Sequence, residues 1–175
     1  MRKTSAYARK RRAIAAQNHY NALDATDKQM DDGLRVAMLT RMWEGLAAIE
    51  SNQSPTIDDW RVCADAVNLM ETLLLRGPWL AADGNMVEVT DPNGLLVDAT
   101  EALRLCAMRY QSGKPLRLDG KGILSLRGLL EDYAQAVSVL SERAVARCFR
   151  LTERRISVIR NGETRPHDVV LVSPC

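Results

Sequence analysis

The chain has 175 residues, enough for one domain with a single core, and its net charge is only +2. Hydrophobic residues make up 46% of the sequence and aromatic residues 5%, a balance that favours helices packed through leucine, alanine, valine and methionine. No stretch approaches the ~18–20 consecutive apolar residues of a membrane-spanning helix, so contact with a membrane is not expected.

The charges are unevenly distributed. Residues 13–140 carry 11 basic and 18 acidic groups, whereas residues 141–175 carry seven basic and four acidic groups. Residues 1–12 carry six basic groups and no acid, namely Arg2, Lys3, Arg9, Lys10, Arg11 and Arg12. We expect a flexible basic arm over residues 1–12 followed by a single helical domain over 13–175. Such an arm can be a solvated tail, bind nucleic acid or a protein, or dock on the chain's own acidic surface.

The first predicted elements are two helices. An alanine-rich segment predicts a helix from about residue 5 to residue 20, and a turn over 24–26 precedes a second helix that runs to about Ser51. Either Thr26 or Asp27 is the expected N-cap of this second helix. Its apolar positions follow helical spacing: Met30, Leu34, Ala37, Met38, Met42, Gly45, Leu46 and Ile49.

A third helix and a β-hairpin follow. Thr56 and Asp59 have the spacing of a capping box and predict a helix that ends before Gly77-Pro78. Over residues 79–89 the apolar pattern changes, and Asp83-Gly84 predicts a tight hairpin turn. The apolar run 169–172 is the expected third strand of this small sheet.

Two further helices complete the prediction. Asp91-Pro92 predicts the start of a fourth helix that runs to about Tyr110. The segment 122–160 then reads as one continuous amphipathic helix with an apolar seam at Leu126, Leu130, Tyr133, Val137, Leu140, Ala144, Cys148 and Leu151. Beside this seam, four arginines lie within about 40–60° of one another on the helix surface: Arg143, Arg147, Arg150 and Arg154. They either cover apolar neighbours with their stems or form a ridge that binds a partner.

Residues suited to catalysis are scarce. The four cysteines are far apart and form no CxxC pair, and the only histidines are His19 and His167. No zinc site, other metal site or cofactor site is therefore predicted. Patterns such as HExxH, GxSxG and the phosphate-binding loops are absent, so we do not expect an enzyme. The basic N-terminus also lacks the apolar region of a secretory signal, which favours the cytoplasm.

One part of the sequence resembles a known group of proteins. The stretch 114–120, with 129–134, 147–150 and 153–156, resembles small uncharacterised proteins encoded by prophages and integrative elements of proteobacteria. The resemblance covers about a quarter of the chain and implies an accessory gene of a mobile element. It implies no role for any residue.

Together these patterns predict a mainly α protein, a bundle of about five helices with a small β-hairpin near residues 79–89. The leading functional hypothesis is a non-enzymatic binding protein of phage or mobile-element type that regulates or inhibits a host protein or nucleoprotein complex. Its expected contact residues are the six cations of the arm and the four arginines of the ridge. The alternatives are a regulator that binds DNA or RNA directly through the arm, and a homo-oligomeric structural protein held together by the long seam.

Overall fold

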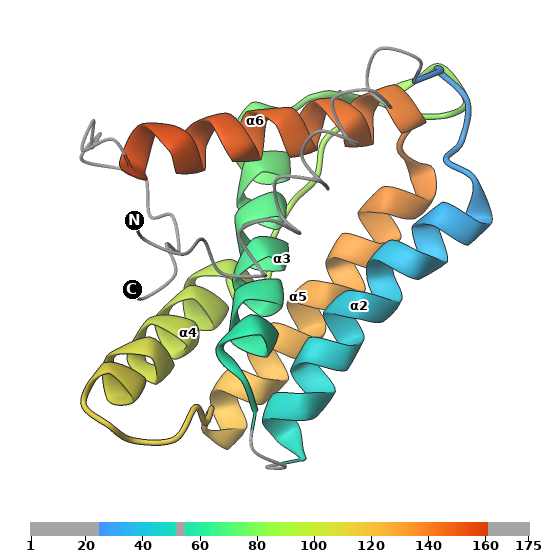
Figure 1. Ribbon diagram of the computed structural model, residues 1–175. Coiled ribbons are helices and arrows are strands. Elements are labelled where there is room, and N and C mark those ends of the chain that lie inside the picture. The colour runs from blue at the N-terminus through green and yellow to red at the C-terminus, as the bar shows by residue number, and fades with distance from the viewer. Residues whose placement is uncertain (1–24, 52–54, 161–175) are drawn as a thin grey trace, which may run out of the picture.

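The computed structural model describes residues 25–51 and 55–160, apart from the side chain of Arg160 (Figure 1). The predicted basic arm, the predicted helix over residues 5–20 and the predicted strand over 169–172 lie outside these residues. The described part has five helices and one two-stranded antiparallel sheet, which confirms a mainly α fold with a small hairpin. Its elements are α2 (Asp32–Glu50), α3 (Ile57–Arg76), β1 (Trp79–Leu80), β2 (Met86–Val87), α4 (Leu95–Gln111), α5 (Gly120–Val139) and α6 (Glu142–Arg160).

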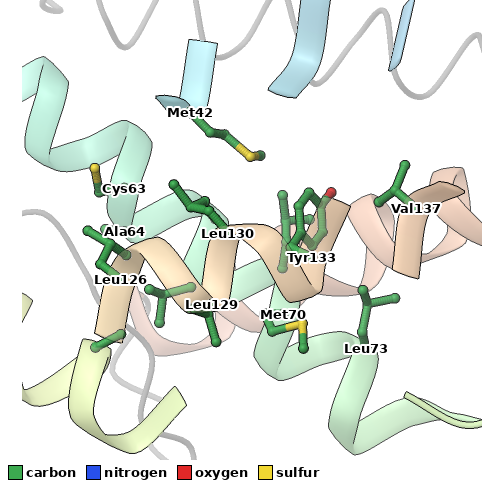
Figure 2. Close-up of a cluster of buried hydrophobic side chains, with 14 of the residues drawn as sticks. Met42, Cys63, Ala64, Met70, Leu73, Leu126, Leu129, Leu130, Tyr133 and Val137 are labelled. Atoms are coloured by element: carbon green, nitrogen blue, oxygen red, sulfur yellow. The ribbon is translucent and has the colours of Figure 1, made fainter. Parts of the chain in front are cut away.

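Helix α3 is the centre of the fold. It contacts α2, α4, α5 and α6, and most of its second half is buried. Figure 1 shows α2 and α5 side by side, α4 against the lower part of α5, and α6 crossing the upper end of α3. The core fills the space between α2, α3 and α5 (Figure 2) and includes Met42, Cys63, Met70, Leu130 and Tyr133. None of the described helices is both long and apolar enough to cross a membrane.

The predicted boundaries of α3 are confirmed. The Thr56 hydroxyl accepts from the Asp59 N–H, and the Asp59 carboxylate accepts from the Thr56 N–H at 2.7 Å, which is a complete capping box. The helix ends at Arg76, before Gly77-Pro78. Local sequence signals alone therefore set both ends of the central helix.

The predicted hairpin is also confirmed, and the described residues extend it in a way that the sequence did not indicate. Trp79 pairs with Val87 and Leu80 with Met86, around a turn in which Gly84 has a φ of 88°. On the other side of β1, the N–H of Ser141 donates to the Leu80 carbonyl at 3.0 Å. The segment between α5 and α6 thus occupies an edge of the small sheet.

The predicted continuous helix over residues 122–160 is wrong. Helix α5 ends at Val139, Leu140 is extended with φ −72° and ψ 147°, and α6 starts at Glu142. The break is favoured because Leu140 and Ser141 pair with backbone elsewhere in the chain, at Ala81 and Gln29, and both side chains are fully buried. The bundle therefore reaches its five described helices by dividing this segment into two.

The predicted start of the second helix is wrong as well. Helix α2 begins at Asp32, and Asp31 is its N-cap, with a carboxylate that accepts from the Leu34 N–H at 3.1 Å. The carbonyl of Thr26, one of the predicted caps, accepts instead from the backbone N–H of Arg143. Residues 25–31 form no helix; the segment bends at residues 27–28 and pairs with the start of α6, and this tertiary pairing takes precedence over a local cap.

Candidate binding face on helix α6

Three contacts fix the N-terminal end of α6. The Ser141 hydroxyl accepts from the Ala144 N–H at 3.2 Å, as an N-cap does. The Glu142 N–H donates to the Lys28 carbonyl at 2.8 Å, and the Glu142 carboxylate accepts from the N–H and the hydroxyl of Thr26. The first turn of α6 is thereby anchored to the segment that precedes α2.

The remaining length of α6 is held by its buried face. This face packs on α3 and on β1 and contains Ala144, Val145, Cys148, Thr152, Arg155 and Ile156. At about 100° per residue, these side chains cover one half of the helix surface, and the four arginines of the predicted ridge fall on the other half. The structure leaves Arg143, Arg147, Arg150 and Arg154 all exposed.

Two of the four arginines have internal partners. Arg143 donates from Nε to the Ala25 carbonyl at 3.2 Å and from Nη1 to Asp27 Oδ2 at 3.0 Å. Arg147 places its guanidinium carbon 5.0 Å from the centre of the fully buried Trp79 ring, a cation–π contact that covers the indole. These two residues therefore help to hold α6 in place as well as contributing charge.

Arg150 and Arg154 differ from them. Within residues 25–51 and 55–160, no hydrogen bond or ion pair holds either guanidinium. They lie one turn apart, about 6 Å along the helix axis, and the whole row from Arg143 to Arg154 extends about 16 Å. The centre and the C-terminal half of α6 thus present cations that no described residue neutralises.

The structure describes only one of the two predicted groups of cations. Arg2, Lys3, Arg9, Lys10, Arg11 and Arg12 lie outside the described residues, so only the ridge on α6 has a defined geometry. We call Arg143, Arg147, Arg150 and Arg154 the α6 arginine face.

Sequence reasoning missed a buried charged cluster beneath this face. Arg155 Nη2 lies 2.6 Å from Glu71 Oε2 of α3, and both side chains are at most 10% exposed. These two atoms are close but poorly aligned for a hydrogen bond, so the contact is mainly electrostatic. Arg155 Nη1 also donates to the Thr72 hydroxyl at 2.8 Å, and the hydroxyls of Thr72 and Thr152 are 2.7 Å apart.

A signal for this cluster was present in the sequence. Arg155 follows Cys148 by seven residues and Thr152 by three, so helical spacing puts it on the apolar face of α6. Glu71 follows the core residue Val67 by four residues and is on the inner face of α3 for the same reason. Two opposite charges on facing apolar stripes predict a buried ion pair.

The thiols are placed as core side chains. Burial raises the pKa of Cys63 and of Cys148 to about 12, and it also raises the pKa of Cys106. A thiol that holds its proton at neutral pH is a poor nucleophile and a poor metal ligand. Among the described residues, no group of three histidine, cysteine, aspartate or glutamate side chains is arranged to hold a metal ion.

Comparison with known proteins adds no relative: no family model, no curated protein and no solved structure matches this chain.

Proposed function

We propose that this chain is a non-enzymatic binding protein of phage or mobile-element type, which docks through the α6 arginine face on an acidic surface of a host protein or nucleoprotein complex. The observation that carries the proposal is the exposed row of four arginines, of which Arg150 and Arg154 have no acidic partner within the described residues. The basic arm would add six cations to the same interaction. The cytoplasm, where such a partner is found, is part of this proposal.

The geometry supports a surface contact rather than chemistry. Arginine presents a planar donor set suited to carboxylates and phosphates, and interfaces are enriched in it. Helix α6 is fixed at its first turn and along its buried face, so a partner would meet arginines on a backbone that is already in place. A pre-organised surface loses little conformational entropy on binding.

The test is a comparison of three forms of the full chain on affinity resin with a proteobacterial lysate. Arg150→Gln/Arg154→Gln removes the two unpaired charges, whereas Lys114→Gln/Arg117→Gln removes two exposed cations from the loop between α4 and α5, at the opposite end of the molecule (Figure 1). We expect a partner that the wild type and the loop variant retain and the α6 variant loses. A partner retained equally by all three forms, or no partner at all, would contradict the proposal.

Direct binding of DNA or RNA is the second candidate, and it is favoured because neither Arg150 nor Arg154 has an acidic partner within the described residues. Each phosphate that a cation neutralises contributes about one unit to the dependence of log K on log salt concentration. For a direct binder, Arg150→Gln/Arg154→Gln should lower this slope by about two, and the loop variant should leave it unchanged. Nuclease treatment of the lysate separates the candidates, because only nucleic-acid-dependent capture is lost.

The alternative of self-association through the long seam has less support. The seam residues from Leu126 to Cys148 are buried in the core of their own chain, so they offer no surface to a second copy. Any self-association has to use another face.

A further inference from the structure

Helix α4 has an outer face with an exposed apolar side chain towards each end, and no described residue covers this face. Its inner side buries Ala99, Leu103 and Cys106 against the core. On its outer side, Val97 is 71% exposed and Met108 is 52% exposed. These two apolar side chains lie eleven residues apart on the same side of the helix.

Between these two apolar residues lies an ion pair on the same face. Glu101 accepts from Arg104 twice, from Nη2 at 2.6 Å and from Nε at 2.7 Å. Arg104 Nη1 also lies 2.9 Å from the sulfur of Met108. At about 100° per residue, Val97, Glu101, Arg104 and Met108 fall within about 60° of one another.

The spacing of these four residues is the same in both directions. The steps along the chain are four, three and four, with an apolar residue at each end and opposite charges in the middle. A two-fold axis perpendicular to the helix, passing beside it level with the midpoint of residues 102 and 103, would place Val97 opposite Met108 of a second, antiparallel copy. The same axis would place Glu101 opposite Arg104 of that copy, and each contact would occur twice.

We propose that α4 is the contact helix of a symmetric antiparallel homodimer, and that a second copy of this chain covers the face formed by Val97, Glu101, Arg104 and Met108. Symmetric dimers require a surface that is complementary to itself, with each residue facing a different one across the axis. A parallel pair would instead set Glu101 against Glu101. Charge complementarity therefore favours a second copy of this chain as the partner and an antiparallel arrangement of the two helices.

The dimer is expected to be weak. One helix pair buries less than the ~1,200 Å² of a small stable interface, which places the dissociation constant on the order of 10–100 μM. Helix α4 lies apart from α6 in Figure 1, so the proposed dimer contact does not use the α6 arginine face. Two copies would present two such faces, and the inference stands whether or not the proposed docking function is right.

Sedimentation equilibrium of the full chain, at concentrations from about 1 to 500 μM, covers the expected dissociation constants and tests the proposal. The wild type should increase in mean mass with concentration, and Val97→Ser should weaken its association about tenfold or more, because the lost apolar contact occurs twice. Val36→Ser is the matched control, since Val36 is 57% exposed on α2, and it should associate like the wild type. A wild type that stays monomeric throughout, or a Val97→Ser variant that associates as well as the wild type, overturns the proposal.

Two charge variants test the orientation. Glu101→Arg gives two arginines on the contact face and Arg104→Glu gives two glutamates, so each protein alone should dimerise about tenfold or more weakly than the wild type because like charges face each other. Mixed in equal amounts, the two should form a heterodimer in which every charged contact is favourable. Circular dichroism before mixing establishes that both are folded. Should either variant be unfolded, the double variant Glu101→Arg/Arg104→Glu serves in its place, because it should associate with itself but not with the wild type. Association that is insensitive to these exchanges would contradict the antiparallel pairing.

Discussion

Separating the buried ion pair between α3 and α6 should be one of the most damaging single changes in this fold. Arg155 and Glu71 have side chains that are 6% and 10% exposed, and their charged atoms approach to 2.6 Å. Two unit charges about 4 Å apart attract by roughly 4 kcal/mol at the effective dielectric constant that suits protein sites. Desolvation offsets much of this attraction while both partners are present, so the pair itself contributes little net stability.

Removing one partner has a different effect. Glu71→Leu leaves the Arg155 guanidinium buried without its counter-charge, and Arg155→Met removes the buried cation that faces the Glu71 carboxylate. We expect each single variant to lose about 3–5 kcal/mol of unfolding free energy, which is a large share of the 5–15 kcal/mol of a typical domain. The double variant Glu71→Leu/Arg155→Met fills a similar volume with apolar side chains and should recover most of that loss, within about 1–2 kcal/mol of the wild type.

Urea denaturation of the four proteins, followed by circular dichroism, measures these differences and the coupling between the two sites. The matched control is the exposed pair Asp32 and Arg35, whose side chains are 79% and 25% exposed and whose coupling should be a few tenths of a kcal/mol. If each single variant at the buried pair costs under about 1 kcal/mol, these two charges are not desolvated as the structure indicates, and the reasoning is refuted.

Three further changes should affect stability measurably. Gly122→Ala should destabilise the protein by about 1–3 kcal/mol in urea denaturation, because a Cβ at Gly122 would lie 2.6 Å from a Cβ of α4. The control is Gly120→Ala, whose Cβ would meet nothing within 4 Å and which should be neutral or slightly stabilising. Thiols of the unfolded chain lose their protons near pH 9, whereas Cys63 and Cys148 of the folded chain hold theirs to about pH 12. The unfolding free energy should therefore be unaffected by these thiols below pH 9 and should fall above it, by up to ~1.4 kcal/mol per pH unit for each thiol. Replacing both cysteines by alanine should flatten this part of a pH titration of unfolding free energy, and an unchanged slope would contradict the assignment. Thr56→Ala should cost about 1 kcal/mol in thermal or urea unfolding through loss of the capping box, and a neutral result would show that the cap is dispensable.

The parts of the fold that sequence predicts well are those specified by neighbouring residues. Thr56 and Asp59 are three positions apart and satisfy each other's backbone donors, so the start of α3 needs no information from the rest of the chain. Gly84 adopts the positive φ that the tight turn of the hairpin requires. The exposure of the four arginines on α6 was predictable in the same way, because helical spacing alone places them together away from the buried face.

The break between α5 and α6 has a different origin. The apolar seam continues in helical spacing through Leu140, and the local sign of a boundary is Ser141, whose hydroxyl caps α6. The backbone leaves the helix because Ser141 donates to Leu80 and Glu142 donates to Lys28, which are distant in sequence. Long-range hydrogen bonds of this kind depend on the packing of the whole bundle, and the apolar periodicity of the sequence does not indicate them.

The break and the buried ion pair depend on each other. If α5 and α6 formed one straight rod, the 19 residues of α6 would extend about 28 Å beyond Val139 along the axis of α5, with their apolar face uncovered. Turning at Ser141 instead lays α6 across α3, but the same turn buries Arg155. The buried Arg155 guanidinium is stable only because Glu71 on α3 lies next to it. Glu71 therefore permits the rotation of α6 in which Ala144, Val145, Cys148 and Ile156 are buried, and that rotation directs the α6 arginine face outward.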